Sequence, residues 1–122
     1  MEIGFDYSLL IPATGDRVPS VYVENHHVVG LDSLDPIKVD FRKPLDNAPK
    51  AYEHPELLRY ASDRQHSEAI VNGVGRIGYM SGGKSALWKD EEFPDLLTDK
   101  AVAFVEENKE QPFFLYYSFH DI

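Results

Sequence analysis

Residues 112–122, PFFLYYSFHDI, decide the fold that we expect of this chain. Positions 113–119 carry aromatic and apolar side chains with one serine among them, which is typical of a strand covered on both faces. In open α/β sheets ligands bind at the carboxyl ends of such strands, and here His120 and Asp121 follow directly. We therefore predict an interior strand over 113–119 that leads to a functional site. Position alone leaves a second interpretation of His120 open, a structural histidine bonded to a neighbouring loop.

A helix is predicted directly before this strand. Apolar residues recur at i, i+4, i+7 and i+8 on one helical face. These residues are Leu97, Ala101, Phe104 and Val105. Thr98 is the expected N-cap, and Asn108 and Pro112 mark the end of the helix. A helix that leads into such a strand is half of a parallel α/β unit.

The expected fold class is therefore α/β, but as an incomplete piece. One helix and one interior strand cannot cover each other's second faces, and no further strand follows residue 119. We interpret residues 1–122 as a single internal segment of a larger domain. Exposed edges of an interior strand would then invite self-association of the isolated chain.

The rest of the chain is expected to consist mainly of hairpin and loops. The expected order is a strand over 3–12, a turn over 13–20, a hairpin of 21–24 with 28–31, a proline-rich surface excursion over 32–55, a short helix from Pro55, and a glycine-rich loop over 72–85.

Composition excludes several classes of protein. The chain has 122 residues, 43% of them hydrophobic, so it is long enough for one core and is not a disordered tail. A net charge of −9 disfavours non-specific binding to nucleic acid or to an anionic membrane. Cysteine is absent, which removes disulfides and thiol chemistry. The residues after Met1 lack the pattern of a signal peptide, and no run is long enough to span a membrane.

Two glycine motifs match nucleotide-binding patterns. Residues 73–78 satisfy G-x-G-x-x-G, yet more glycines stand where a dinucleotide-binding helix would begin. Residues 78–85 satisfy the P-loop pattern G-x-x-x-x-G-K-[ST], in which backbone N–H groups and a lysine bind phosphate. The segment before Gly78 is too polar for the required core strand. We favour a loop that presents Lys84, and keep a P-loop nucleotide-binding protein as an alternative.

The other histidines give no metal pattern. His26 and His27 lie at the expected hairpin tip, where a solvated turn is the simpler interpretation. His54 precedes a proline, and His66 lies in a polar stretch. Neither has partners at the spacing of metal ligands.

Two longer runs carry a resemblance to a known family. The first is GFDYSLLIPATGDRVPSVYVEN, residues 4–25, and the second is TDKAVAFVEENKEQPFFLYYSFHDI, residues 98–122. The second contains T-D-x-A-x-x-F-x-x-x-N-x-x-x-P-F-F-L-Y. Together they resemble the middle of a type I sulfatase, of the arylsulfatase family with the alkaline-phosphatase-like α/β fold. The stretches ATGDRVPSVYVEN, residues 13–25, and RIGYMSGGK, residues 76–84, look most like those of polysaccharide-degrading bacteria.

This resemblance implies hydrolysis of sulfate esters, of sulfated carbohydrate or an aryl sulfate. In the family a formylglycine nucleophile attacks sulfur, Ca²⁺ and cationic side chains hold the sulfate oxygens, and a histidine protonates the leaving alcohol. The nucleophile signature C/S-x-P/A-x-R and the Ca²⁺ ligands have no match in this chain. We therefore expect those parts outside it, no turnover by this chain alone, and a periplasmic or secreted parent enzyme.

The expected contribution of this chain is one wall of the substrate pocket. Arg17 would bind a sugar hydroxyl or carboxylate, with Asp16 beside it, and Lys84 would add positive charge. His120, the nearest candidate for a catalytic residue, and Asp121 would border the leaving group. An alternative for Asp16 and Arg17 is that they pair with each other in a turn. A non-enzymatic α/β interaction module is the remaining alternative for the whole chain.

Overall fold

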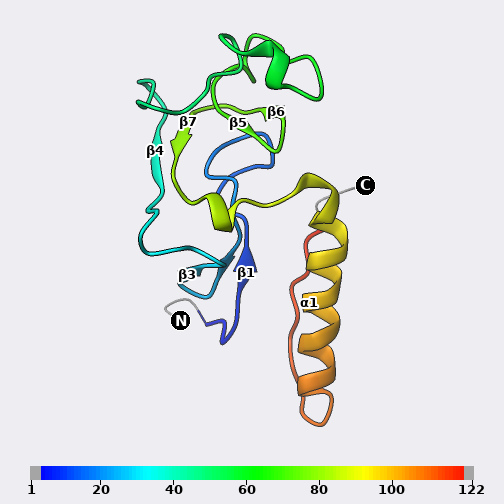
Figure 1. The fold of residues 1–122 in the computed structure, drawn as a ribbon. Coiled ribbons are helices and arrows are strands. Elements are labelled where there is room, and N and C mark those ends of the chain that lie inside the picture. Colours follow the sequence, from blue (N-terminus) through cyan, green and yellow to red (C-terminus); the bar gives the residue numbers. More distant parts are fainter. Residues whose placement is uncertain (1–3, 120–122) are drawn as a thin grey trace. The chain divides into compact units, whose positions relative to one another are not determined.

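The computed structural model describes residues 4–119, which form two compact units that divide between Trp88 and Lys89 (Figure 1). His120 and Asp121, named above as site candidates, lie outside the described residues.

The first unit is built from short antiparallel strand pairs. One sheet joins β1 (Leu9–Leu10), β2 (Val23–Glu24) and β3 (His27–Val28) in that order. A second sheet pairs β4 (Lys38–Asp40) with β7 (Tyr79–Ser81), and a third pairs β5 (Ile70–Val71) with β6 (Val74–Gly75). Isolated bridges join Arg17 to Ile77, Val21 to Leu87 and Lys50 to Ala69.

The predicted hairpin is confirmed, and it is shorter than the apolar runs suggested. Val23 pairs with Val28 and Glu24 with His27, so Asn25 and His26 form the turn. Asn25 adopts a positive φ of 54°, which asparagine tolerates better than most residues. The exposed hairpin tip agrees with the solvated turn expected for His26 and His27.

Two expectations for this unit are wrong. The proline-rich excursion contains β4, and the supposed glycine-rich loop contains β6 and β7, which pairs with β4. Sequence reasoning missed the turn signal Asn72-Gly73, where φ is 54° and 70°, positive at both positions as a two-residue type I′ hairpin turn requires. The chain therefore uses its glycines for tight turns between strands.

The core of the first unit is small. It consists of Val18, Val21, Ala69, Met80 and Ala86, with Val28, Ile37, Val39 and Leu87 packed around it. Trp88 is 3% exposed, and its ring lies 5.9 Å from that of Tyr22. Of two short 3₁₀ helices, η1 (Pro55–Leu57) has no buried residue, whereas η2 (Lys84–Ala86) contributes Ala86 to the core. The predicted short helix at Pro55 is therefore a single 3₁₀ turn.

The second unit is a helix with an extended segment beside it. The 3₁₀ turn η3 (Asp90–Glu92) leads into α1 (Phe93–Asn108), whose first turn contains Pro94 and Asp95. The helix therefore begins five residues before the predicted N-cap, and Thr98 lies inside it. Its end at Asn108 is as predicted.

Residues 112–119 run back along α1 without forming a strand, so the predicted interior strand is wrong for this chain (Figure 1). Phe113 contacts Phe104 edge to face at 5.5 Å, and Tyr117 Oη lies 3.1 Å from Thr98 Oγ1. Phe114 and Tyr116 are each 74% exposed. A strand requires a neighbouring backbone for its N–H and C=O groups, and the described chain offers none here. The parallel α/β unit is accordingly not formed.

Candidate functional site

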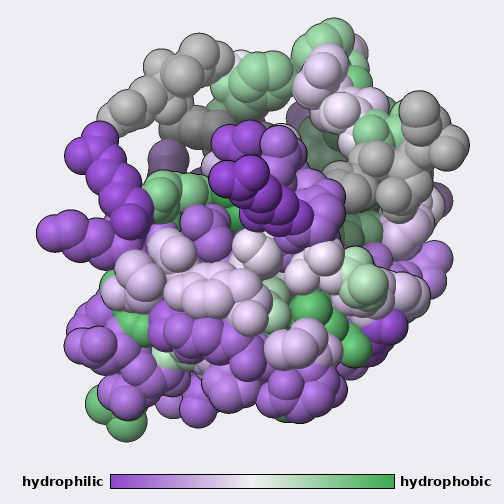
Figure 2. All heavy atoms as spheres, turned by 90° about the horizontal axis from the view of Figure 1, so that it is seen from above, coloured by the Kyte–Doolittle hydropathy of each residue, from purple (hydrophilic) through white to green (hydrophobic). Residues whose placement is uncertain are grey.

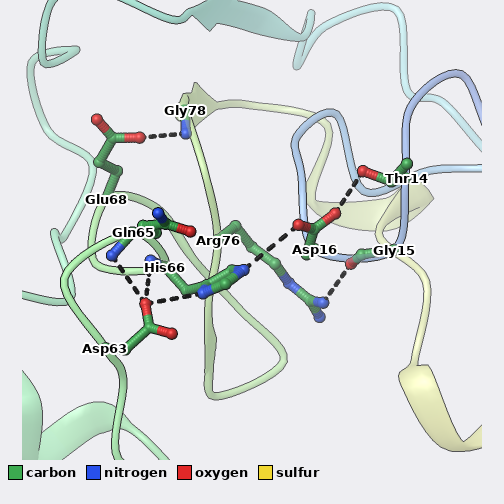
Figure 3. A network of polar contacts seen from close by, with 9 residues as sticks. All are labelled: Thr14, Gly15, Asp16, Asp63, Gln65, His66, Glu68, Arg76 and Gly78. Atoms are coloured by element: carbon green, nitrogen blue, oxygen red, sulfur yellow. Dashed lines mark hydrogen bonds and ion pairs between the residues drawn. The ribbon is translucent and has the colours of Figure 1, made fainter.

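The turn over residues 14–17 lies in a polar network that joins it to residues 63–78 (Figure 3). Asp16 and Arg17 belong to this turn, which Arg17 N closes by donating to the Thr14 carbonyl at 3.0 Å. On its other side the turn pairs with Ile77. Ile77 N donates to the Asp16 carbonyl at 2.9 Å, and Val18 N donates to the Ile77 carbonyl at 3.1 Å. The backbone around Arg17 is therefore fixed from both ends.

The Asp16 carboxylate is directed toward His66 and away from a pairing with its neighbour. Its Oδ2 lies 3.3 Å from His66 Nε2, and its Oδ1 accepts a hydrogen bond from Thr14 Oγ1. No ion pair joins Asp16 to Arg17 within residues 4–119, so the alternative of a mutual pair is not what the structure shows. Thr14 is the first cause of the lowered pKa of Asp16, and His66 lowers it further against the opposing effect of burial.

His66 is the residue that sequence reasoning dismissed. Its Nδ1 lies 2.8 Å from Asp63 Oδ1, which also accepts hydrogen bonds from the backbone N–H groups of Gln65 and His66 at 2.8 and 2.9 Å. The imidazole thus stands between two carboxylates, Asp63 and Asp16. The hydrogen bond with Asp63 raises the pKa of His66 more than desolvation lowers it, and Asp16 raises it further. The network therefore favours the imidazolium form.

Arg76 supports the same turn from the buried side. It is 3% exposed, and its Nη1 donates to the Gly15 carbonyl at 2.6 Å while Nη2 donates to the Val71 carbonyl at 3.3 Å. Its guanidinium carbon lies 5.9 Å from the centroid of the Trp88 ring, within the range of a cation–π contact. A buried arginine bonded to backbone carbonyls holds loops together, and it does not offer its charge to a ligand.

Arg17 is exposed, in contrast to Arg76. In the described part of the chain its side chain makes neither a hydrogen bond nor an ion pair, although its backbone is held firmly. Such a guanidinium keeps its five donors for an external acceptor. The local sequence signal for Asp63 and His66 is their i, i+3 spacing, but the contact to Asp16 crosses fifty residues and has no local signal.

Lys84 lies on a different loop. Its backbone N–H donates to Asp35 Oδ2 at 2.9 Å, Gly83 N donates to the Asp35 carbonyl at 2.9 Å, and the Lys84 side chain is exposed. No contact joins Lys84 to Asp16 or Arg17 among residues 4–119. The exposure of Lys84 agrees with the expectation, but Lys84 begins the 3₁₀ helix η2 and is not in a loop. Its place in a common site with Arg17 stays a prediction.

Neither nucleotide-binding motif has the geometry that phosphate binding requires. Residues 73–78 form a hairpin turn and strand β6, with no helix after them. Residues 78–85 contain β7 and are followed by η2, a three-residue 3₁₀ helix, where a P-loop needs a long helix pointing at the phosphate. Nothing in the structure favours the nucleotide-binding alternative.

Within residues 4–119, no group of three or more histidine, aspartate or glutamate side chains is placed to hold a metal ion. The described residues therefore do not fit the Ca²⁺ that the family resemblance implies, and no chemical step is assigned to a metal here. None of the helices in this part of the chain is long and apolar enough to cross a membrane.

Comparison with known proteins shows what this chain is similar to. The chain is 52% identical over 121 residues to an N-acetylgalactosamine-6-O-sulfatase of Bacteroides thetaiotaomicron, a match that covers 99% of this chain and 24% of that protein. The chain is homologous to a segment of a sulfatase. No family model matches it.

A solved structure supports the assignment to this sulfatase segment. That structure comes from work on the metabolism of multiple glycosaminoglycans by Bacteroides thetaiotaomicron. It superimposes with a TM-score of 0.95 at 52% sequence identity, and the match covers 98% of this chain and 25% of the other. The sulfatase segment thus spans about a quarter of the length of each relative, and the sulfatase resemblance of its sequence is confirmed.

Proposed function

We propose that this chain is part of a sulfatase that hydrolyses sulfate esters of carbohydrate. The observation that carries the proposal is 52% identity over nearly the whole chain to an N-acetylgalactosamine-6-O-sulfatase. A backbone that matches a solved structure at a TM-score of 0.95 supports it. The proposed substrate class is a sulfated amino sugar or a related glycosaminoglycan unit. The whole segment would belong to one catalytic domain of the alkaline-phosphatase-like fold.

Within that enzyme, the proposed role of this chain is to bind the sugar. Arg17 would donate two parallel hydrogen bonds to a hydroxyl pair or carboxylate of the substrate, because a planar guanidinium suits bidentate acceptors. Lys84 would add positive charge against the sulfated ligand. His120 and Asp121 would border the leaving group. Their positions are proposed from the sequence alone.

The chemistry of the proposed reaction explains why cationic groups are needed. A sulfate ester is anionic, so a nucleophile is repelled unless positive charge neutralises the sulfate oxygens. We propose that the formylglycine nucleophile and the Ca²⁺ ligands are supplied by parts of the parent enzyme other than this chain. The chain alone would then bind weakly and turn nothing over. A periplasmic or secreted location of the parent is part of the same proposal.

The test uses the intact protein that carries this chain, with N-acetylgalactosamine 6-sulfate as substrate and released sulfate as the readout. Arg17→Ala is expected to lower kcat/KM about tenfold, since a charged hydrogen bond contributes roughly 1.5–3 kcal/mol. Arg64→Ala, which removes another exposed arginine, is the matched control and should change little. Unchanged kinetics of Arg17→Ala would remove Arg17 from the sugar site. Absence of sulfate release by the wild-type protein from any sulfated sugar would defeat the proposed function itself.

A further inference from the structure

Asp16 and Arg17 are neighbours in the sequence, but their side chains differ in the hydrogen-bond partners that the structure gives them. Both carboxylate oxygens of Asp16 already have partners within the chain, Thr14 on Oδ1 and His66 on Oδ2. The Arg17 side chain is exposed and makes neither a hydrogen bond nor an ion pair in the described part of the chain, although its positive charge contributes to the lowered pKa of Asp16. An acceptor that is already bonded on both oxygens offers less to a sugar hydroxyl than a guanidinium with all its donors available.

The partner of Asp16 is itself rigidly held. Asp63 Oδ1 accepts two backbone N–H groups and faces His66 Nδ1, so the imidazole is oriented by a carboxylate on the side opposite Asp16 (Figure 3). Gly75 allows the His66 loop to approach this closely, because a Cβ at that position would stand 2.0 Å from the His66 carbonyl oxygen. With both ring nitrogens facing carboxylates, the imidazole acts as a two-ended donor between Asp63 and Asp16.

The backbone of the turn is fixed independently. Arg76 bonds the Gly15 carbonyl at 2.6 Å, and Ile77 pairs with the backbone on both sides of Arg17. These bonds determine where the turn lies. They do not fix the side chain of Asp16. The contact with His66 does so, and it sets the direction of the carboxylate next to Arg17. A carboxylate released from His66 would be able to swing onto the neighbouring guanidinium.

We propose that His66 is a positioning residue that holds the Asp16 carboxylate away from Arg17 and so keeps the Arg17 guanidinium available to the sugar. The inference rests on the proposed function, since it presumes that Arg17 contacts substrate. It goes beyond that function by giving the two neighbours different roles: Arg17 contacts the ligand, and the Asp16 carboxylate is held by His66. His66 contacts neither the substrate nor the reacting atoms.

A double-mutant cycle in the intact protein tests this division. His66→Ala alone is expected to raise KM for N-acetylgalactosamine 6-sulfate about tenfold, with kcat within about twofold, because binding is lost and the chemical step is untouched. Combined with Arg17→Ala, His66→Ala is expected to add nothing, since His66 acts only through Arg17. His54→Ala removes a histidine that bonds an exposed glutamate, Glu56, at 3.0 Å, and serves as the matched control with wild-type kinetics.

The outcomes separate the two proposals. If Arg17→Ala lowers kcat/KM but the effect of His66→Ala is the same with and without Arg17, His66 does not act through Arg17 and the positioning role is wrong. If Arg17→Ala leaves the kinetics unchanged, the proposed contact of Arg17 fails and the positioning role falls with it. Should His66→Ala fail to fold, Asp63→Asn carries the same cycle, because it removes the carboxylate that orients the imidazole.

Discussion

The pKa of His66 depends in part on a contact with Asp16, a residue fifty positions away in the sequence. In the sequence it is a histidine in a polar stretch. In the structure it stands between Asp63 and Asp16, and the pKa of His66 is raised, first by its hydrogen bond with Asp63. The pKa values of Asp63 and Asp16 are lowered, Asp63 first by the backbone N–H of His66 and Asp16 first by Thr14.

These shifts predict a pH-dependent contribution of His66 to stability. A raised pKa means that the folded state favours the imidazolium, so the stabilisation is present below the ordinary pKa of about 6.5 and disappears as pH rises through the folded value. The lowered carboxylate pKa values preserve it down to about pH 4. His66→Gln should therefore lower the free energy of unfolding more at about pH 5.5 than at about pH 8.5.

Urea unfolding of wild type and variant at the two pH values measures this difference. The charged groups bonded to the imidazole are Asp63 and Asp16. A difference between wild type and His66→Gln that is the same at both pH values would show that folding does not raise the pKa of His66.

Arg76 is the second residue whose importance depends on its position. Replacing it with methionine keeps much of its volume but removes charged hydrogen bonds to the Gly15 and Val71 carbonyls. Each such bond contributes roughly 1.5–3 kcal/mol, so Arg76→Met should lower the free energy of unfolding by about 3 kcal/mol. Arg64→Met, at an exposed position, should change it by less than about 0.5 kcal/mol in the same urea titration. Equal effects of the two substitutions would contradict the role given to Arg76.

At the scale of elements, the short strands of the first unit are defined by their turns. Asn72 and Gly73 close the β5–β6 hairpin, and Gly82 lies where a Cβ would meet the Pro36 carbonyl oxygen at 2.1 Å. Strands of two or three residues contribute little pairing energy by themselves. Strand pairing therefore depends more on the turn residues than on the apolar runs.

Gly75 in β6 provides the test at this scale. Its Cβ in Gly75→Ala would lie 2.0 Å from the backbone oxygen of His66, and no flexible side chain is available to move aside. We expect a loss of about 1–3 kcal/mol in the free energy of unfolding, as in other overpacked sites. Amide hydrogen exchange should show the loss of protection concentrated in residues 63–78. Unchanged exchange in that range would mean that the His66 loop does not approach β6 this closely.

For the whole molecule, the second unit leaves much apolar surface exposed. Phe114 and Tyr116 are each 74% exposed and Phe119 72% exposed, although all three belong to the most apolar run of the sequence. In the face shown in Figure 2, hydrophilic residues predominate and hydrophobic residues lie scattered among them. Exposed rings on an extended segment that belongs to no strand favour association with another backbone.

We therefore expect the isolated chain of 122 residues to self-associate. The double substitution Phe114→Lys and Tyr116→Lys places two charges on the extended segment and should shift the chain toward monomer in sedimentation velocity. Ala103→Lys with Glu107→Gln, at exposed positions of α1, adds the same charge and gives the control. A wild-type chain that is monomeric at about 100 μM, well within the range where exposed strands aggregate, would contradict the prediction.

Local spacing and long shared motifs were enough to predict the resemblance to a sulfatase, the hairpin that contains residues 23–28, the end of α1 at Asn108 and the exposure of Lys84. Tertiary structure decided the rest. Pairing of β4 with β7, the contact of His66 with Asp16 and the burial of Arg76 all join residues about forty to sixty positions apart. The apolar run 113–119 was predicted as a strand from its hydrophobicity alone. A strand also requires hydrogen bonds to a neighbouring backbone, which the local sequence does not reveal.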